Sequence, residues 1–246
     1  MLTWPPDPDA WSLRWYKNMI GNCSADVVSS TVPCSDKWVT GTINSFFIGF
    51  VATFIATALG TLAALGLSRP HMPYKGLIMA ILISPMIVPL IITAAGMFFF
   101  YARINLVYSF TGIILAHVAL ATPFVVITVT ATLVGFDMNM VKASQSLGAK
   151  PLRTFFKIIM PLILPGVISG ALFAFITSFD EVVIVMFMAS LDQLTIPKQM
   201  WAGIRQEISP VILCMATCLV VLSIFLLTTV ELLRRRSEKL RGITAR

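Results

Sequence analysis

The stretch Asp137–Gly166, "DMNMVKASQSLGAKPLRTFFKIIMPLILPG", is the longest polar and basic interruption in the second half of a very apolar chain. A capping residue, Asp137 or Asn139, precedes a short segment with apolar residues on one side, which predicts a short helix with a mildly apolar face. Gly148 predicts a left-handed helix end, and Pro151 follows three residues later. A second helix is expected to begin near Pro151 and to continue without a polar gap into a hydrophobic segment.

The composition of the whole chain indicates a membrane protein. The 246 residues are 57% hydrophobic and 12% charged, and the mean hydropathy is +0.88. Soluble domains carry roughly 25% charged residues, so this chain has too little charge to cover a globular surface in water. We therefore expect it to fold in a lipid bilayer. The net charge of +7 then needs no nucleic acid as a partner, because Lys and Arg concentrate in the loops on one side of a membrane.

Five long stretches lack Asp, Glu, Lys and Arg, and each has the roughly 20 residues that a helix needs to cross the hydrocarbon core. The predicted fold is an all-α membrane protein, a helical bundle of five transmembrane helices at residues 42–67, 77–101, 109–134, 158–188 and 209–232. The fourth span is unusual because Asp180 and Glu181 lie inside it.

Two sequence patterns predict how the spans pack. Small residues recur every four positions on the first span, which allows close helix approach; they are Ala52, Ala56, Gly60 and Ala64. Prolines are expected to bend the second and third spans; they are Pro85, Pro89 and Pro123.

The lysines and arginines predict the orientation. Twelve of them lie at one set of span ends, namely Arg69, Lys75, Lys142, Lys150, Arg153, Lys157, Arg234, Arg235, Arg236, Lys239, Arg241 and Arg246. Six lie at the opposite ends, namely Arg14, Lys17, Lys37, Arg103, Lys198 and Arg205. The side with twelve should be cytoplasmic. The C-terminus is then cytoplasmic and, with five spans, the N-terminus is extracytoplasmic. The expected domains are an extracytoplasmic segment 1–40, a transmembrane domain 41–233 with a cytoplasmic loop 137–157, and a basic cytoplasmic tail 234–246.

The cysteine and histidine positions suggest structural roles. Cys23 and Cys34 fall on the extracytoplasmic side, where oxidising conditions permit a disulfide; the alternative is two free thiols. His117 is expected to form an interhelical hydrogen bond rather than to bind a ligand. The sequence has no Cys, His and Asp cluster with metal-ligand spacing and no phosphate loop "GxxxxGK[ST]". We therefore expect no catalytic residue, metal or cofactor in this chain.

The segment "KASQSLGAKPLRTFFKIIMP" resembles the EAA loop of bacterial ABC importer permeases (type I importer fold). That pattern is EAA, three residues, Gly, nine residues, Ile, one residue, Leu-Pro. The matching positions are Lys142, Ala143 and Ser144 for EAA, Gly148 for the glycine, Ile158 for the isoleucine, and Met160 and Pro161 for Leu-Pro. The chain departs from the pattern at Lys142, Ser144 and Met160. The lost Glu affects any polar contact that the family's carboxylate makes with its ATPase, whereas the helix–Gly–helix geometry is kept.

Other stretches are similar to the polyamine-type (spermidine/putrescine) branch of these permeases. They are "SLRWYKN", "SPMIVPLIITAAGMFF", "AHVALATPFVV", "FITSFDEVVIVMFM" and "TIPKQMWAGIRQEISP", and the similarity runs from about residue 12 to 233. Members of that branch usually have six spans, with one helix before the "WY" segment. That first helix is missing here, so either the start codon is misplaced or the subunit works with five.

The resemblance implies a permease subunit of an ATP-driven importer in the bacterial inner membrane. Two permease subunits would enclose a path for a small cationic solute such as a polyamine. An extracytoplasmic solute-binding protein would deliver the solute, and two ATPase subunits, which bind ATP and Mg, would dock on the cytoplasmic loops. The implied ATPase-coupling residues lie in the loop 138–157 and just beyond it; they are Lys142, Ala143, Ser144, Gly148, Ile158 and Pro161.

The two intramembrane carboxylates are the candidate path or gating residues, because charges within a membrane span are costly. Neighbours on a helix point about 100° apart, so we expect Asp180 to face the path and Glu181 to face a neighbouring helix. Alternatively, both carboxylates pair with Lys198 or Arg205 at the outer membrane edge. Two other functions also stay open at this point. One is a proton-coupled secondary transporter that uses Asp180 or Glu181 as a relay. The other is a membrane-embedded enzyme, which no nucleophile–base pair or metal set supports.

Overall fold

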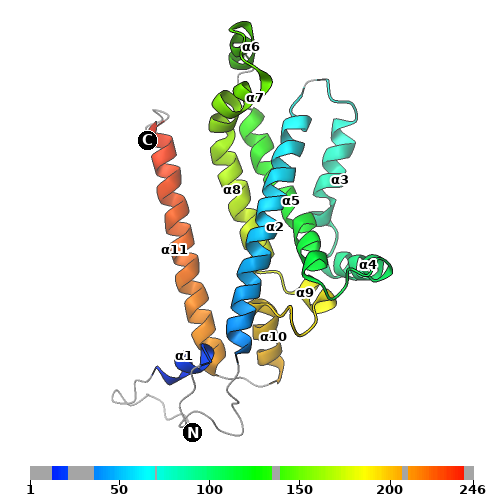
Figure 1. Cartoon of the computed structure of the whole chain (residues 1–246), viewed down its shortest axis with the longest axis vertical. Helices are drawn as coiled ribbons and strands as arrows, with labels where there is room; N and C mark the ends of the chain where they lie inside the picture. The colour runs from blue at the N-terminus through cyan, green and yellow to red at the C-terminus, as the bar shows by residue number, and fades with distance from the viewer. Residues whose placement is uncertain (1–12, 22–35, 70, 135–138, 207–209, 241–246) are drawn as a thin grey trace. The chain divides into compact units, whose positions relative to one another are not determined.

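The computed structural model describes residues 13–21, 36–69, 71–134, 139–206 and 210–240, and every regular element in these ranges is a helix, as predicted (Figure 1). The helices are α1 (Arg14–Met19), α2 (Lys37–Leu67), α3 (Lys75–Ile87), α4 (Leu90–Arg103), α5 (Phe110–Val134), α6 (Asn139–Ser146), α7 (Pro151–Thr154), the π-helical turn η2 (Phe155–Ile159), α8 (Met160–Phe179), α9 (Val183–Met188), α10 (Ile196–Gln206) and α11 (Pro210–Leu240).

The chain divides into two compact units. Unit 1 comprises Met1–Asn44 and Leu194–Arg246, and unit 2 comprises Ser45–Gln193. Among the described residues, four helical segments are long and apolar enough to cross a membrane: Lys37–Leu67, Phe110–Val134, Pro151–Phe179 and Pro210–Thr228. A fifth span is present if α3 and α4 count as one. Four of the five expected spans therefore contain a long apolar helix, and the remaining one is broken.

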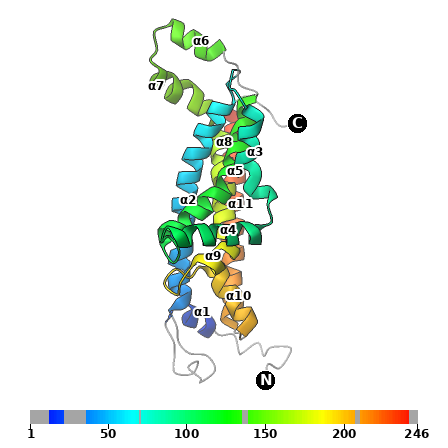
Figure 2. The same cartoon turned by 90° about the vertical axis from the view of Figure 1, so that its right-hand side faces the viewer.

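The predicted second span, 77–101, is not one continuous helix. α3 and α4 meet at an angle of 104°, so the pair forms a broken span or a re-entrant loop (Figure 2). The break falls at Val88, whose backbone is extended with ψ 134°, directly before Pro89. A residue before proline is pushed out of the α region, and proline has no N–H to continue the helix. Pro123, by contrast, lies inside α5, which continues to Val134.

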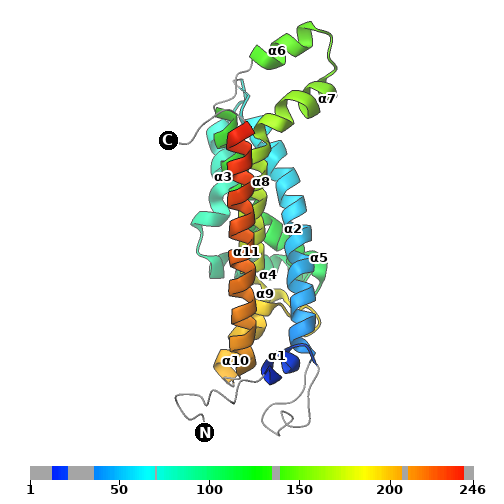
Figure 3. The same ribbon diagram turned by 90° about the vertical axis from the view of Figure 1, so that its left-hand side faces the viewer.

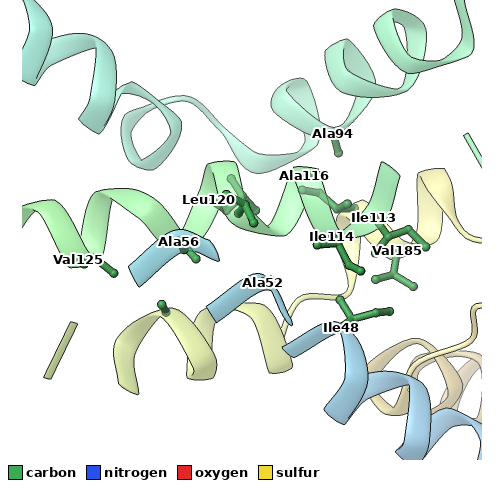
Figure 4. Close-up of a cluster of buried hydrophobic side chains, with 14 of the residues drawn as sticks. Ile48, Ala52, Ala56, Ala94, Ile113, Ile114, Ala116, Leu120, Val125 and Val185 are labelled. Carbon is green, nitrogen blue, oxygen red and sulfur yellow. The ribbon is translucent and has the colours of Figure 1, made fainter. Parts of the chain in front are cut away.

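The core of unit 2 is built around α5, which is buried along most of its length. The small residues of α2 pack as expected: Ala52, Ala56 and Ala64 are fully buried, and the side of α2 that carries Ala52 and Ala56 faces α5 (Figure 4). A Cβ on Gly60 would lie only 2.6 Å from Val125 Cβ of α5. Small side chains on α2 therefore let two backbones approach closely, as the four-residue repeat predicted.

α8 packs against both α5 and α2. In its middle, Gly166 and Gly170 face Thr132 and Thr128 of α5. Near its end, Phe175 and Phe179 form a ring cluster with Phe46 and Phe50 of α2, with centroid separations from 5.1 to 6.4 Å. Together these contacts hold α8 from Gly166 to Phe179 within unit 2.

The predicted fourth span, 158–188, ends earlier than expected. α8 stops at Phe179, and a separate short helix, α9, begins at Val183. The sequence prediction was wrong here because it treated the apolar run after Asp180 and Glu181 as more of the same helix. The two carboxylates instead lie in the turn that separates α8 from α9.

In unit 1, α1 and α10 both contact α11 (Figure 3). Gly203 of α10 allows close approach, since a Cβ there would lie 2.7 Å from Ile212 Cδ1 of α11. The side chain of Asn44 donates to the carbonyl of Leu194 at 2.9 Å, which ties the start of α2 to the segment before α10. Partial burial lowers the pKa of Lys198 in α10 below its ordinary value.

Candidate functional site

The first candidate region is the α6–α7 hairpin, defined here as residues 139–159 and comprising α6, α7 and the π-helical turn. Gly148 ends α6 with φ +75°, in the left-handed conformation predicted for it. The N–H of Gly148 donates to Gln145 O at 2.9 Å, and the N–H of Ala149 donates to Ser144 O at 3.1 Å. These two bonds satisfy carbonyls at the helix end in the pattern of a Schellman motif. Pro151 then occupies the first turn of α7, as expected.

The surface of the α6–α7 hairpin is apolar and basic. Leu147 is 88% exposed, and Met140, Leu152 and Phe156 are also exposed. The exposed cations between them are Lys142, Lys150, Arg153 and Lys157. No Asp or Glu occurs anywhere in residues 139–179. An exposed apolar patch on a short helix that has few neighbours in its own unit is typical of a docking surface.

The coupling residues predicted from the sequence lie in the hairpin and, for Pro161, in the first turn of α8 directly after it. Lys142, Ala143 and Ser144 lie on α6, and Gly148 forms the turn after it. Ile158 lies in the π-helical turn, and Pro161 lies in the first turn of α8. Ser144 is buried and its hydroxyl lies 2.9 Å from the hydroxyl of Thr154. Sequence reasoning missed Thr154, because no local pattern indicates a hydrogen bond between residues ten apart.

The second candidate region is the break between α8 and α9, and the two carboxylates there have different surroundings. Asp180 is exposed and follows the last residue of α8. Glu181 is only 7% exposed, and its Oε1 accepts a 2.9 Å hydrogen bond from the backbone N–H of Ile184. Glu181 therefore caps the first turn of α9, which is a structural role, whereas the Asp180 carboxylate forms no ion pair with a described residue of unit 2.

A buried polar pair lies one turn before this break. His117 of α5 is 1% exposed, and its Nδ1 lies 2.8 Å from the hydroxyl of Ser178 on α8. This contact confirms the interhelical hydrogen bond that the sequence analysis expected of His117. It ties α5 to α8 three residues before Glu181.

The loop between α4 and α5 holds the far end of α9. The N–H of Tyr108 donates to Met188 O at 2.9 Å. Asn105 and Tyr108 both have positive φ, 56° and 61°, which is rare for an aromatic residue such as Tyr108 and indicates a backbone held by its surroundings. Gly112 is required nearby, since a Cβ there would collide with the carbonyl of Leu106.

α8 connects the two candidate regions. It follows the α6–α7 hairpin directly and ends at the break that contains Asp180 (Figure 1). Its 20 residues correspond to a length of roughly 30 Å at 1.5 Å per residue. Among the described residues, no group of three or more His, Cys, Asp or Glu side chains is placed to hold a metal ion. The disulfide candidates Cys23 and Cys34 lie outside the described residues, so their pairing stays a prediction.

Comparison with a family of known proteins gives a match over most of the chain. The family described as binding-protein-dependent transport system inner membrane component matches residues 56–239. The spermidine/putrescine transport system permease protein PotC of Haemophilus influenzae is 30% identical over 228 residues, covering 93% of this chain and 84% of the relative. PotC of Escherichia coli K12 is 32% identical over 229 residues, covering 93% and 82%. The putrescine transport system permease protein PotI of the same strain is 29% identical over 215 residues, covering 84% and 72%.

Solved structures of similar fold are also transporters. An inward-facing MetNI methionine ABC transporter matches with a TM-score of 0.57 and 21% identity, covering 84% of this chain and 96% of the other. An amino acid ABC transporter crystallised with histidines matches with a TM-score of 0.60 and 18% identity, covering 81% and 94%. At these identities the likeness concerns the fold.

Proposed function

This chain belongs to the family of binding-protein-dependent transport system inner membrane components, and we propose that it forms part of the translocation path for a small cationic solute such as a polyamine. The family membership confirms the resemblance to ABC importer permeases and favours that function over the proton-coupled alternative. A permease component is a transport subunit rather than an enzyme. The substrate class rests on the names of the relatives and on the carboxylate at the end of α8.

One observation carries the proposal: α8 joins the exposed α6–α7 hairpin to the break at Asp180. A soluble ATPase that binds the hairpin would move a helix that is packed along α5 by Gly166 and Gly170 and along α2 by its phenylalanines. Because packed helices move as rigid bodies, displacement at the hairpin would reach the break. Alternating access would then follow from ATP-driven closure of the ATPase subunits.

The hairpin supplies the ATPase-coupling surface of this proposal. Its exposed leucines and methionine, led by Leu147, offer apolar contact area, and Gly148 sets the angle between α6 and α7. Lys142, Ala143 and Ser144 occupy the first positions of the coupling motif, and Ile158 and Pro161 its last. Since Lys142 stands where the family pattern has Glu, any polar contact at this position is made by a cation.

The break at the end of α8 supplies the selectivity element. Asp180 is an exposed carboxylate that directly follows Phe179, the last residue of α8. In a low-dielectric path, such a carboxylate attracts a cation and repels an anion. Putrescine and spermidine are small organic cations of the kind that this charge favours. Glu181, which caps α9, would position the backbone of the gate rather than contact the solute.

The full assembly in this proposal contains more than one chain. A second permease subunit would complete the path, two ATPase subunits would bind ATP and Mg, and an extracytoplasmic solute-binding protein would deliver the substrate. The chain itself would carry no cofactor. It would lie in the bacterial inner membrane with residues 1–40 outside and the basic tail 234–246 in the cytoplasm.

Uptake by the assembled complex tests the proposal. The tagged chain would be purified with its partner subunits, reconstituted in proteoliposomes, and given labelled putrescine or spermidine with the solute-binding protein. We expect uptake that requires ATP on the ATPase side and that neutral or anionic solutes do not compete with. Uptake that proceeds without ATP under an imposed proton gradient would contradict the proposal.

A further inference from the structure

A buried hydrogen bond between two side chains joins the two helices of the α6–α7 hairpin. The hydroxyl oxygens of Ser144 on α6 and Thr154 on α7 lie 2.9 Å apart. Ser144 is 7% exposed and Thr154 is 3% exposed, and no other side chain in residues 139–159 is buried. The hairpin therefore has no hydrophobic core of its own. Its shape rests on the Gly148 turn and on this buried pair of hydroxyl groups.

The direction of the hydrogen bonds follows from the number of available protons. The Ser144 hydroxyl also lies 2.9 Å from the carbonyl of Val141, to which it donates. A serine hydroxyl has one hydrogen, so Thr154 is the donor in the contact between the two side chains. The chain of bonds runs from Thr154 to Ser144 to Val141. Each hydroxyl group thus donates one hydrogen bond, and the Ser144 oxygen also accepts one from Thr154.

Thr154 lies at the junction between α7 and the helical segment that leads into α8. It is the last residue of α7, directly before the π-helical turn Phe155–Ile159 that leads into α8. Single π-helical turns often mark functional sites within helices. A bond from α6 to Thr154 therefore also holds α6 relative to the start of α8. Without this bond, only the turn at Gly148 would constrain the angle between α6 and α7.

We propose that Thr154 is a positioning residue for energy coupling: its hydrogen bond to Ser144 holds α6 in a fixed orientation relative to α8, so that movement of α6 is transmitted to the break at Asp180. This inference rests on the proposed function of the hairpin. The EAA pattern has Ala at the position of Ser144, and alanine cannot accept this bond. The hydroxyl pair is therefore a feature of this chain rather than of the pattern.

The test uses the full complex in proteoliposomes and four variants. Thr154→Val removes the donor with little change in shape, and Thr154→Ser keeps it. Ser144→Ala removes the acceptor, and the double variant Ser144→Ala with Thr154→Val removes both. The control is Thr217→Val, because Thr217 is an exposed threonine on α11 whose hydroxyl bonds only its own helix at Leu213 O. Two quantities are measured: amide hydrogen exchange of residues 139–154, and the number of solute molecules imported per ATP hydrolysed.

We expect Thr154→Val to raise the exchange rates of α6 amides roughly 2- to 10-fold, the range that corresponds to one net hydrogen bond. The import-to-hydrolysis ratio should fall by a similar factor while the ATPase subunits still co-purify. Thr154→Ser and Thr217→Val should match the wild type in both quantities. Ser144→Ala should be at least as severe as Thr154→Val, because it leaves a buried donor without its acceptor. The double variant should be no worse than Ser144→Ala, since the two residues act as one pair.

The two readouts separate the possible failures. Unchanged exchange in Thr154→Val would show that the hydroxyl pair does not hold α6, and the inference would be wrong. Faster exchange with an unchanged import-to-hydrolysis ratio would show a structural bond without a coupling role, which also overturns the inference. A wild-type complex with no ATP-dependent import would instead overturn the proposed function, and with it the coupling role of Thr154.

Discussion

At the scale of single residues, the backbone geometry at Gly148 constrains which residue can occupy this position. Its φ of +75° lies in the left-handed region, and a Cβ added there would meet no atom within 4 Å. A substitution is therefore opposed by the backbone alone and not by crowding. For residues other than Gly, Asn and Asp, the left-handed conformation costs about 1–2 kcal/mol, and it is least favourable for β-branched side chains.

Gly148→Val should keep the subunit in the membrane but uncouple it. The valine would shift the turn out of the left-handed conformation and change the angle between α6 and α7, so ATP-driven import should fall several-fold. Gly148→Asn is the matched control and should retain most activity, because asparagine tolerates positive φ. Import and ATPase co-purification are compared in proteoliposomes and in detergent. Wild-type import by Gly148→Val would show that the turn does not set the coupling geometry.

The cysteines near the N-terminus give a second prediction at this scale. Cys23 and Cys34 lie eleven positions apart in the segment expected outside the membrane, and both fall outside the described residues. We expect them to form a disulfide, since the loop between them is short and the compartment is oxidising. Mass spectrometry of unreduced peptides from the purified membrane protein decides the matter. Two thiols that react with an alkylating reagent before reduction would exclude the bond.

At the scale of the elements, the sequence predicted the long helices well because their signals are local. Stretches without charge gave α2, α5 and α11, and the small-residue repeat on α2 predicted its close approach to α5. Gly148 and Pro151 likewise predicted the end of α6 and the start of α7. These predictions share a cause. Helix length, capping and small-residue spacing each depend on residues that are close together in the sequence.

The predicted and observed helices differ where an apolar run changes direction. Val88–Pro89 breaks the second span at 104°, and the predicted bend underestimated this. Pro89 was a signal for a break, since a residue before proline avoids the α region. Proline alone does not determine a break, however, because Pro123 lies within the continuous helix α5. The end of α8 at Phe179 had no clear local signal. The next helix, α9, begins where the Glu181 carboxylate accepts a hydrogen bond from the N–H of Ile184, a contact that hydropathy cannot indicate.

Close packing between α5 and α8 gives the prediction for this scale. A Cβ on Gly166 would collide with the side chain of Thr132 and would lie 3.1 Å from the carbonyl oxygen of Thr128. Gly166→Val should therefore push the helices apart and destabilise the subunit by about 1–3 kcal/mol. Gly96→Val on α4 is the matched control, because a Cβ there meets nothing within 4 Å.

The stability of the two glycine variants is compared as the thermal midpoint of the purified subunit in detergent. We expect a clearly lower midpoint for Gly166→Val than for Gly96→Val. Equal midpoints would indicate that α5 and α8 can separate without loss, and α8 would then be a poor candidate for transmitting movement. The outcome thus bears on function as well as on packing.

At the scale of the whole molecule, the sequence predicted both candidate regions and a helix that runs from one to the other, but not where that helix ends. The EAA-like spacing located the α6–α7 hairpin, and the rarity of intramembrane carboxylates pointed to Asp180 and Glu181. Neither pattern could show that α8 ends at the carboxylates, because the apolar run continues to Leu191. The structure also shows that Asp180 is exposed whereas Glu181 is buried. Their spacing on an ideal helix predicts only that the two side chains point in different directions.

That inequality leads to different expectations for Asp180→Asn and Glu181→Gln. Asp180 is exposed and has no ion-pair partner among the described residues of unit 2, so its charge is available to a cationic solute. A hydrogen bond to a charged group contributes about 1.5–3 kcal/mol, so Asp180→Asn should lower putrescine or spermidine import at least about tenfold. Glu181→Gln keeps the side-chain oxygen that accepts from Ile184 N–H, so α9 should stay capped and import should change much less.

Import of labelled putrescine and spermidine by the assembled complex, at several solute concentrations, distinguishes a loss of affinity from a loss of rate. We expect Asp180→Asn to raise the concentration needed for half-maximal import and to weaken the preference for cationic over neutral solutes. If Asp180→Asn and Glu181→Gln both retain wild-type import and the same preference, the acidic pair has a structural role only. The cationic substrate class would then rest on the relatives alone, because the physical argument for it depends on the charge of Asp180.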